Sequence, residues 1–151
     1  MEFSIISEMF EMMEKTTKRI ELTNILVELL KKTPKKIIPN VVYLLQGIIR
    51  PNFEGVELGI AEKLAIRAIS KSAGLPIKKI EDDYRESGDL GLTASNILKI
   101  KTQTTFTAEK ITVERVYETL FKIAKLEGKG SQDLKMKYIS SLLNDATPLE
   151  A

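Results

Sequence analysis

The sequence contains no cysteine and no histidine among its 151 residues. The absence of cysteine excludes disulfides and thiolate metal sites. The absence of histidine removes the commonest general base, the usual metal ligand and the centre of any Ser-His triad. The sequence therefore argues against hydrolases of the familiar kinds.

Long apolar runs are also missing. No segment approaches the ~18–20 consecutive apolar residues that a membrane-spanning helix needs. The acidic, amphipathic start MEFSIISEMF is not that of a signal peptide. With 43% hydrophobic and 29% charged residues, the composition is that of a globular protein, and we expect one compact domain with no membrane partner.

Neither sign of charge is in large excess, because the formal net charge is only +2. Lys and Arg nevertheless gather in residues 15–36, and acidic residues gather in residues 81–89. A basic region of this kind can meet phosphates, whereas chance clustering on solvated helices is the alternative. The carboxylates of residues 81–89 would suit Mg²⁺ in an enzyme, but we favour a solvated acidic helix there.

Apolar residues recur at helical spacing in almost every segment. We therefore predict an all-α fold, a compact multi-helix domain of about eight or nine helices. In the second helix, Ile20, Leu26 and Leu29 are expected to face the core, and in the last helix Leu134 and Tyr138. Residues 50–59 are predicted to be a loop, and the threonine-rich residues 99–111 an exposed loop or short hairpin.

Three threonines stand where helices are expected to begin. Thr33 precedes Pro34, and Thr112 precedes an apolar stripe, so both are predicted N-caps. Thr147, Pro148 and Glu150 form a capping box, which is typical of the first residues of a helix, yet the sequence ends at Ala151. We expect the chain to be a fragment of a longer polypeptide, with a frayed tail as the alternative.

The most informative stretch is GKGSQDLKMKY, at residues 128–138. Two glycines flank a lysine just before a helix, where free N–H groups and the helix dipole favour an anion such as phosphate. The alternative is an ordinary loop followed by a solvated helix. A second basic segment lies at residues 16–19. The candidate phosphate contacts are Gly128, Lys129, Gly130, Ser131 and Gln132, with Lys135 and Lys137 nearby, and, in the second segment, Thr16, Thr17, Lys18 and Arg19.

Together these segments resemble the N-terminal DNA-binding domain of archaeal and eukaryotic ATP-dependent DNA ligases. The matching segments, in order, are EMFEMMEKTTKRIELTNILVELLKK, VVYLLQGIIRPNFEGVELGIAEKLAIRAIS, the GDLG turn at 88–91, ITVERVYETLFKIAKLEGKGSQDLKMKYISSLL and DATPLEA. They cover essentially the whole chain, and GVELGIAEK and GKGSQDLK are the specific parts.

The resemblance implies a helical domain that holds nicked duplex DNA across the minor groove through backbone phosphates, in DNA replication, repair and recombination. It implies a cytoplasmic, nucleoid-associated protein whose full-length form adds nucleotidyltransferase and OB-fold domains and uses ATP and Mg²⁺. The Lys-x-Asp-Gly motif that carries the nucleotidyl lysine in such ligases does not occur in this sequence. We therefore expect this chain, residues 1–151, to be a single DNA-binding domain with no catalytic residues, no metal and no cofactor of its own.

A sliding clamp is the second partner that the resemblance implies. Archaeal members bind it with a loop that carries a glutamine and two aromatic residues. Gln103 and Phe106 occupy matching positions, and Thr107 stands in place of the second aromatic. The alternative function is therefore a helical protein-interaction domain whose main partner is a clamp.

Overall fold

In a computed structural model, residues 1–100 and 109–151 are described, and they form eight α-helices and two single-turn 3₁₀-helices without a β-strand. The prediction of an all-α fold is confirmed. None of the described helices is both long and apolar enough to cross a bilayer. The elements are α1 (Phe3–Glu14), α2 (Arg19–Lys32), η1 (Lys35–Ile37), α3 (Ile38–Leu45), η2 (Asn52–Glu54), α4 (Glu62–Ala73), α5 (Ile77–Ser87), α6 (Leu90–Lys99), α7 (Val113–Ala124) and α8 (Ser131–Asp145).

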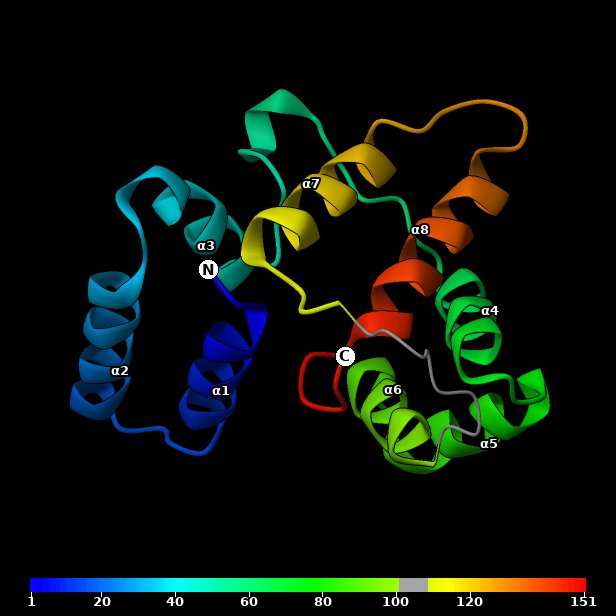
Figure 1. The fold of residues 1–151 in the computed structure, drawn as a ribbon, viewed down its shortest axis with the longest axis horizontal. Coiled ribbons are helices and arrows are strands. Elements are labelled where there is room, and N and C mark those ends of the chain that lie inside the picture. The colour runs from blue at the N-terminus through cyan, green and yellow to red at the C-terminus, as the bar shows by residue number, and fades with distance from the viewer. Residues whose placement is uncertain (101–108) are drawn as a thin grey trace.

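The helices form two lobes with α7 between them (Figure 1). The first lobe consists of α1, α2 and α3, and the second of α4, α5, α6 and α8. Each lobe has a hydrophobic cluster of its own, because amphipathic helices bury their apolar stripes against near neighbours. The first cluster is Ile6, Met9, Leu29, Ile37, Val41 and Val113, and the second is Ile66, Ile69, Ala73, Ile80, Ala94, Ile97, Leu98 and Leu143.

Helix α7 joins the lobes through polar contacts as well as packing. The N–H of Val113 donates to the carbonyl of Met1, and the N–H of Phe3 donates to the carbonyl of Ile111. On the other side, the Arg115 guanidinium donates to the Asp145 carboxylate of α8 at 2.6 Å. These contacts fix α7, and therefore the turn that follows it, relative to both lobes.

One of the predicted helix caps is confirmed, and a cap that the sequence analysis did not predict is present on α6. The Thr112 hydroxyl accepts from the N–H of Arg115, as predicted, and Asp89 caps α6 in the same way. The prediction for Thr33 is wrong. Its buried hydroxyl donates to the Leu29 carbonyl one turn earlier, at 2.7 Å, so Thr33 is the C-cap of α2 and not an N-cap. A threonine before proline suits either role, and here the bond to the preceding turn prevails.

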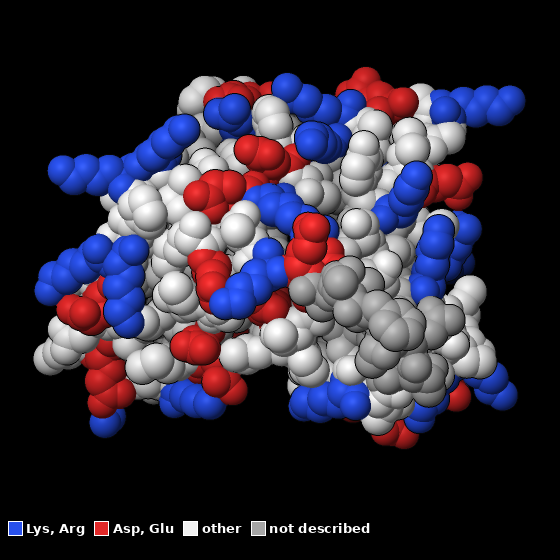
Figure 2. Space-filling model, in the orientation of Figure 1, with Lys and Arg blue, Asp and Glu red and all other residues white. Residues whose placement is uncertain are grey.

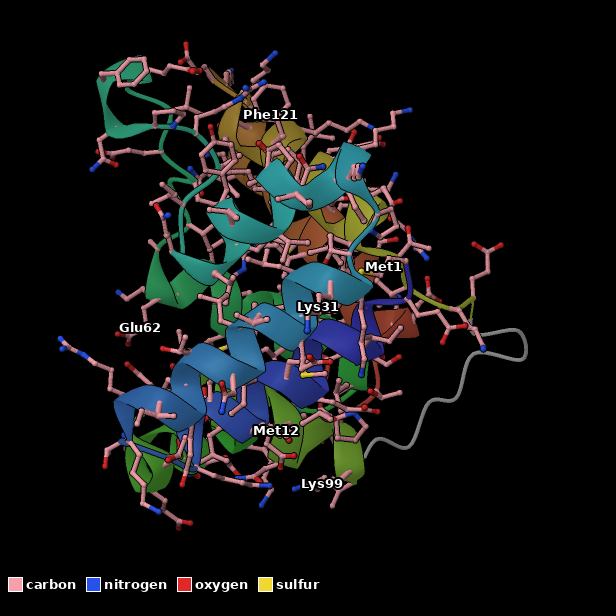
Figure 3. All side chains as sticks on the ribbon, turned by 90° about the vertical axis from the view of Figure 1, so that its left-hand side faces the viewer. Met1, Met12, Lys31, Glu62, Lys99 and Phe121 are labelled. Carbon is pink, nitrogen blue, oxygen red and sulfur yellow. The ribbon has the colours of Figure 1, made fainter. Side chains whose placement is uncertain are left out.

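The inward faces of α2 and α8 also differ from the prediction. Ile20 is 76% exposed and Leu134 is 46% exposed, although Leu29 is buried as expected. Figure 3 shows α2 on the outside of the first lobe, with α1 behind it, so one side of α2 faces solvent. In α8 the face against α4 carries Ser140, whose hydroxyl donates to the Ala68 carbonyl.

Candidate nucleic-acid interface

The turn between α7 and α8 is built on two glycines in the left-handed conformation. Gly128 has φ +81° and Gly130 has φ +86°, a region that other residues rarely enter. The N–H of Ser131 donates to the Gly128 carbonyl, which closes the turn. A Cβ atom added at either glycine would meet nothing within 4 Å, so the surface in front of the turn is open.

The N-terminus of α8 has no side-chain cap. Gly130 occupies the capping position and cannot supply one. Among the described α-helices only α6 and α7 have a side-chain cap, so what distinguishes α8 is the glycine turn in front of it. The first helical bond is the one from the N–H of Leu134 to the Gly130 carbonyl. The N–H groups of Gln132 and Asp133 precede it and have no acceptor within the helix, so they point outward with the positive end of the helix dipole. This geometry suits an oxyanion.

The side chains around this turn are of mixed character. Lys129 and Gln132 are exposed, while Ser131 is buried and directed into the fold. Asp133 lies in the first turn of α8 and its carboxylate is 3.9 Å from the Arg67 guanidinium. An anion at this position favours the helix but competes with a phosphate for the same dipole. Figure 2 shows blue and red side chains interspersed on this side of the molecule, without a uniformly basic patch.

Lys135 does not belong to the exposed surface. The residue is only 6% exposed, and its Nζ donates to the carbonyls of Leu58 and Gly59 at 3.2 and 3.3 Å. Gly59 permits this approach, since a Cβ there would lie 2.9 Å from Nζ. Lys135 thus fastens the segment GVELG to the segment GKGSQDLK. Lys137 is exposed and, being two residues further along the helix, points about 200° away from Lys135.

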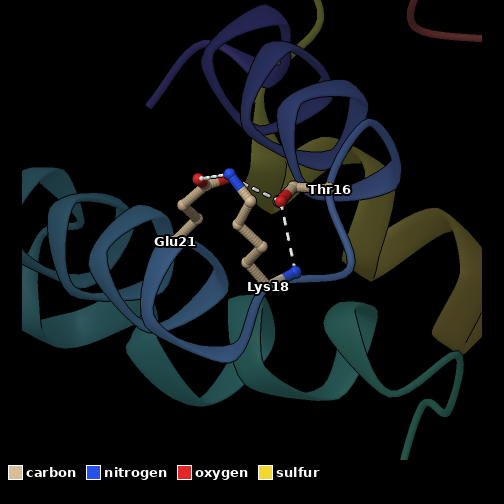
Figure 4. A network of polar contacts seen from close by, with 3 residues as sticks. All are labelled: Thr16, Lys18 and Glu21. Carbon is tan, nitrogen blue, oxygen red and sulfur yellow. Dashed lines mark hydrogen bonds and ion pairs between the residues drawn. The ribbon is translucent and has the colours of Figure 1, made fainter.

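The second predicted segment forms the turn between α1 and α2 (Figure 4). The Lys18 ammonium lies 2.8 Å from the Glu21 carboxylate, which also accepts a hydrogen bond from the Thr16 hydroxyl. The hydrogen bonds from Lys18 and then from Thr16 lower the pKa of Glu21 below its usual value. Lys18 therefore has an ion-pair partner within the chain, and the pair is exposed, so the attraction is screened by solvent. Thr17 and Arg19 are exposed, and Arg19 has no ion-pair partner among the described residues.

The two predicted segments lie far apart. In Figure 1 the α7–α8 turn is at the upper right and the α1–α2 turn at the lower left, at opposite corners of the molecule. The structure therefore does not combine them into one compact surface. Gln103 and Phe106, the candidate clamp contacts, lie outside the described residues. In the part of the chain that the structure describes, no group of carboxylates is arranged to hold a metal ion, including those of residues 81–89.

Sequence reasoning missed a third element, the segment at residues 50–55, which lies beside the end of α7. Arg50 stacks its guanidinium on the Phe121 ring at 4.9 Å, and the Lys125 ammonium lies 4.1 Å from the same ring. The Tyr117 hydroxyl donates to the Ile49 carbonyl at 2.6 Å, and burial raises the pKa of this tyrosine above its ordinary value. The only signal in the sequence was an aromatic residue, Phe53, within a predicted loop.

The comparisons with known proteins agree with the sequence segments quoted above. A family model described as "DNA ligase N terminus" matches residues 2–151. The chain is 73% identical to a DNA ligase of Nitrosopumilus maritimus and 62% identical to a DNA ligase of Cenarchaeum symbiosum, over the whole chain but only 26% of each relative. It is 47% identical to a probable DNA ligase of Aquifex aeolicus, again over the whole chain and 26% of that protein. The chain thus spans about a quarter of the length of these curated relatives.

Proposed function

The chain belongs to the DNA ligase N-terminus family, and from this premise we propose that it is the DNA-binding part of a ligase. In this proposal it holds nicked duplex DNA on the minor-groove side, through backbone phosphates and without reading the base sequence. The resemblance stated above is confirmed. The mode of DNA binding is what the resemblance implies, and the geometry of the α8 N-terminus supports its phosphate contacts.

The uncapped N-terminus of α8, behind the Gly128–Gly130 turn, is the observation that carries the proposal. Its outward N–H groups and dipole are suited to one phosphate, and exposed Lys129 and Gln132 add a charge and an amide beside it. Contacts of this kind position a duplex but carry no sequence information. Lys135 is not among the proposed contacts, because its ammonium is already bonded to two carbonyls inside the fold.

We propose no catalysis by this chain. The sequence lacks Lys-x-Asp-Gly, and the resemblance assigns the nucleotidyl lysine, ATP and Mg²⁺ to domains that this chain does not contain. A parent protein with those domains would join the nick that this domain holds. Incubation with labelled ATP is therefore expected to leave the chain unlabelled.

The proposal is tested by titrating a fluorescently labelled nicked duplex with the full chain at low salt and following its anisotropy. We expect binding, with no change when the base pairs flanking the nick are exchanged for others. The control is Glu86→Gln, which removes an exposed carboxylate on α5, away from the α7–α8 turn, and should not alter binding. Failure to bind at low salt, or a strong dependence on base sequence, would contradict the proposal.

A second proposal, binding of a sliding clamp through Gln103 and Phe106, is supported by the resemblance alone. Phe106→Ala should weaken binding to an archaeal clamp while DNA affinity and melting temperature stay near those of the parent. A large fall in melting temperature would instead assign the ring to the folded core.

A further inference from the structure

Phe53 is an aromatic side chain held out into solvent by an ordered turn. The residue is 88% exposed, the most exposed of the large hydrophobic residues in the described part of the chain. It sits in η2, where the N–H of Glu54 donates to the Pro51 carbonyl and the N–H of Gly55 to the Asn52 carbonyl. Gly55 then reverses the chain with φ +63°. Because Pro51 and the two hydrogen bonds of the turn restrict the backbone, this segment loses little backbone entropy when the ring binds a partner.

The base of this turn is anchored to α7. Ile49 is buried, and its carbonyl accepts the hydrogen bond from the Tyr117 hydroxyl. Tyr117 in turn stacks on Phe121, with ring centroids 6.5 Å apart. The position of the Phe53 turn is therefore set by α7, the helix that leads into the proposed phosphate site.

Two cations flank the turn on the side of α7. Phe121 holds the Arg50 guanidinium and the Lys125 ammonium against its ring. The Nε of Arg50 is buried without a hydrogen-bond acceptor in the described part of the chain, since the nearest carboxylate, that of Glu54, is 3.9 Å away. Stacking fixes the guanidinium plane while the side chain stays partly exposed, so its outer N–H groups can reach a phosphate.

The Phe53 turn and the proposed phosphate site lie along one edge of the molecule. Lys125 is three residues before Gly128, so it connects the two. Figure 1 shows η2 and the α7–α8 turn along the upper edge, and Figure 3, turned by 90°, shows Phe121 at the same end. A duplex that lay along this edge would meet the N-terminus of α8, Lys125 and the Phe53 turn in order.

We propose that Phe53 contacts the bases of the bound duplex as an apolar wedge in the minor groove, with Arg50 and Lys125 on the neighbouring phosphates. This inference rests on the proposed function and adds to it a base-contacting residue. Minor-groove proteins insert single apolar side chains between base steps in this way. A nick is a favourable place for such a wedge, because one strand is already interrupted. The contact does not depend on the base sequence, since every base has an apolar face.

The chain contains no tryptophan, so Phe53→Trp creates a single fluorescent reporter at the tip. We expect nicked duplex to quench the emission of this tryptophan and to shield it from acrylamide. The midpoint of this fluorescence titration should equal the midpoint obtained for the same variant from the anisotropy of a labelled duplex. The matched control is Leu92→Trp, a reporter at a half-exposed apolar residue of α6, away from both candidate segments. Its emission should not respond to the duplex.

Phe53→Ala supplies the affinity measurement. Loss of a base–aromatic contact should weaken binding by about 5- to 150-fold, whereas Leu92→Ala should leave it unchanged. Both side chains are exposed, so melting temperatures should match that of the parent. If the duplex binds but the emission of the Phe53→Trp variant stays constant and Phe53→Ala binds like the parent, the wedge is excluded and the tip faces a protein partner instead. If the parent itself does not bind the duplex, the proposed function fails, and this inference fails with it.

Discussion

At the scale of single residues, Lys135 shows why charge in a sequence is ambiguous. The residue lies in the basic segment after the glycines, yet its ammonium bonds two carbonyls of the GVELG segment. Those acceptors are more than seventy residues away in sequence. No local pattern could have predicted that contact, whereas the caps by Thr112 and Asp89 depend on residues three positions away and can be predicted from sequence.

Lys135→Met is expected to destabilise the fold. The substitution keeps an unbranched side chain of similar length but leaves the Leu58 and Gly59 carbonyls without their donor, a loss of about 1–3 kcal/mol. The free energy of unfolding, measured with urea, gives the effect. Lys137→Met on the exposed side of α8 is the control and should change stability by less than about 0.5 kcal/mol. Equal stabilities of the two variants would mean that the bonds of Lys135 contribute nothing.

Gly130→Val tests the turn that precedes α8. Its φ of +86° strains any branched residue, so a stability loss of about 1–3 kcal/mol is expected. The added side chain also stands in front of the outward N–H groups, so DNA affinity should fall further than in Lys129→Ala, which removes one flexible charge. Anisotropy and urea unfolding separate the two effects.

The control for Gly130→Val is Gly88→Val. Gly88 also has a positive φ, +69°, and open space at its Cβ, but it lies between α5 and α6. The Gly88→Val variant should therefore be less stable than the parent and bind DNA with the same affinity. If Gly130→Val stays folded and binds as well as the parent, the turn is only a connection between helices, and the segment at residues 16–19 becomes the leading candidate.

At the scale of elements, the existence of the helices could be predicted but their inward faces only in part. The apolar spacing in α4 places Leu64, Ala68 and Ile69 in the core, as the sequence suggests. In α8 the buried positions include Ser131, Lys135 and Ser140. The side chains of Lys135 and Ser140 find backbone acceptors in other elements, so they are buried without unsatisfied bonds. Hydrophobic periodicity does not contain this information.

Helix α2 provides the test of this interpretation. Leu29 is fully buried against α1, and Leu29→Ala should cost about 2–5 kcal/mol of unfolding free energy. Ile20→Lys, on the outer side of the same helix, should change stability by less than about 0.5 kcal/mol. The free energies of unfolding of both variants are measured with urea and compared with that of the parent. A comparable loss in Ile20→Lys would show that the outer face of α2 is covered in solution.

At the scale of the whole molecule, the candidate site depends on a meeting of elements that are distant in sequence. Residues 49–55 follow α3 of the first lobe, and residues 128–133 begin α8 of the second. Both reach the same edge because α7 binds one through Tyr117 and leads directly into the other. The sequence identified the glycine turn, whose signal is local. It could not identify Phe53 or Arg50 as neighbours of that turn, because their placement depends on how α7 packs between the lobes.

The charge distribution of the whole molecule predicts a steep dependence of DNA binding on salt. With a net charge of only +2 and acidic groups interspersed among the basic ones, long-range attraction is small, and affinity depends on individual phosphate contacts. Each contact lowers log K by about 0.9 for a tenfold rise in salt, so roughly three to five contacts give a slope of about −2.7 to −4.5. Affinity should therefore fall by at least about 500-fold between about 20 and 200 mM salt, in anisotropy titrations with one nicked duplex. Lys125→Gln should reduce the slope by about one, since it removes one phosphate contact. A complex that is insensitive to salt would mean that apolar or base-specific contacts, and not phosphates, hold the duplex.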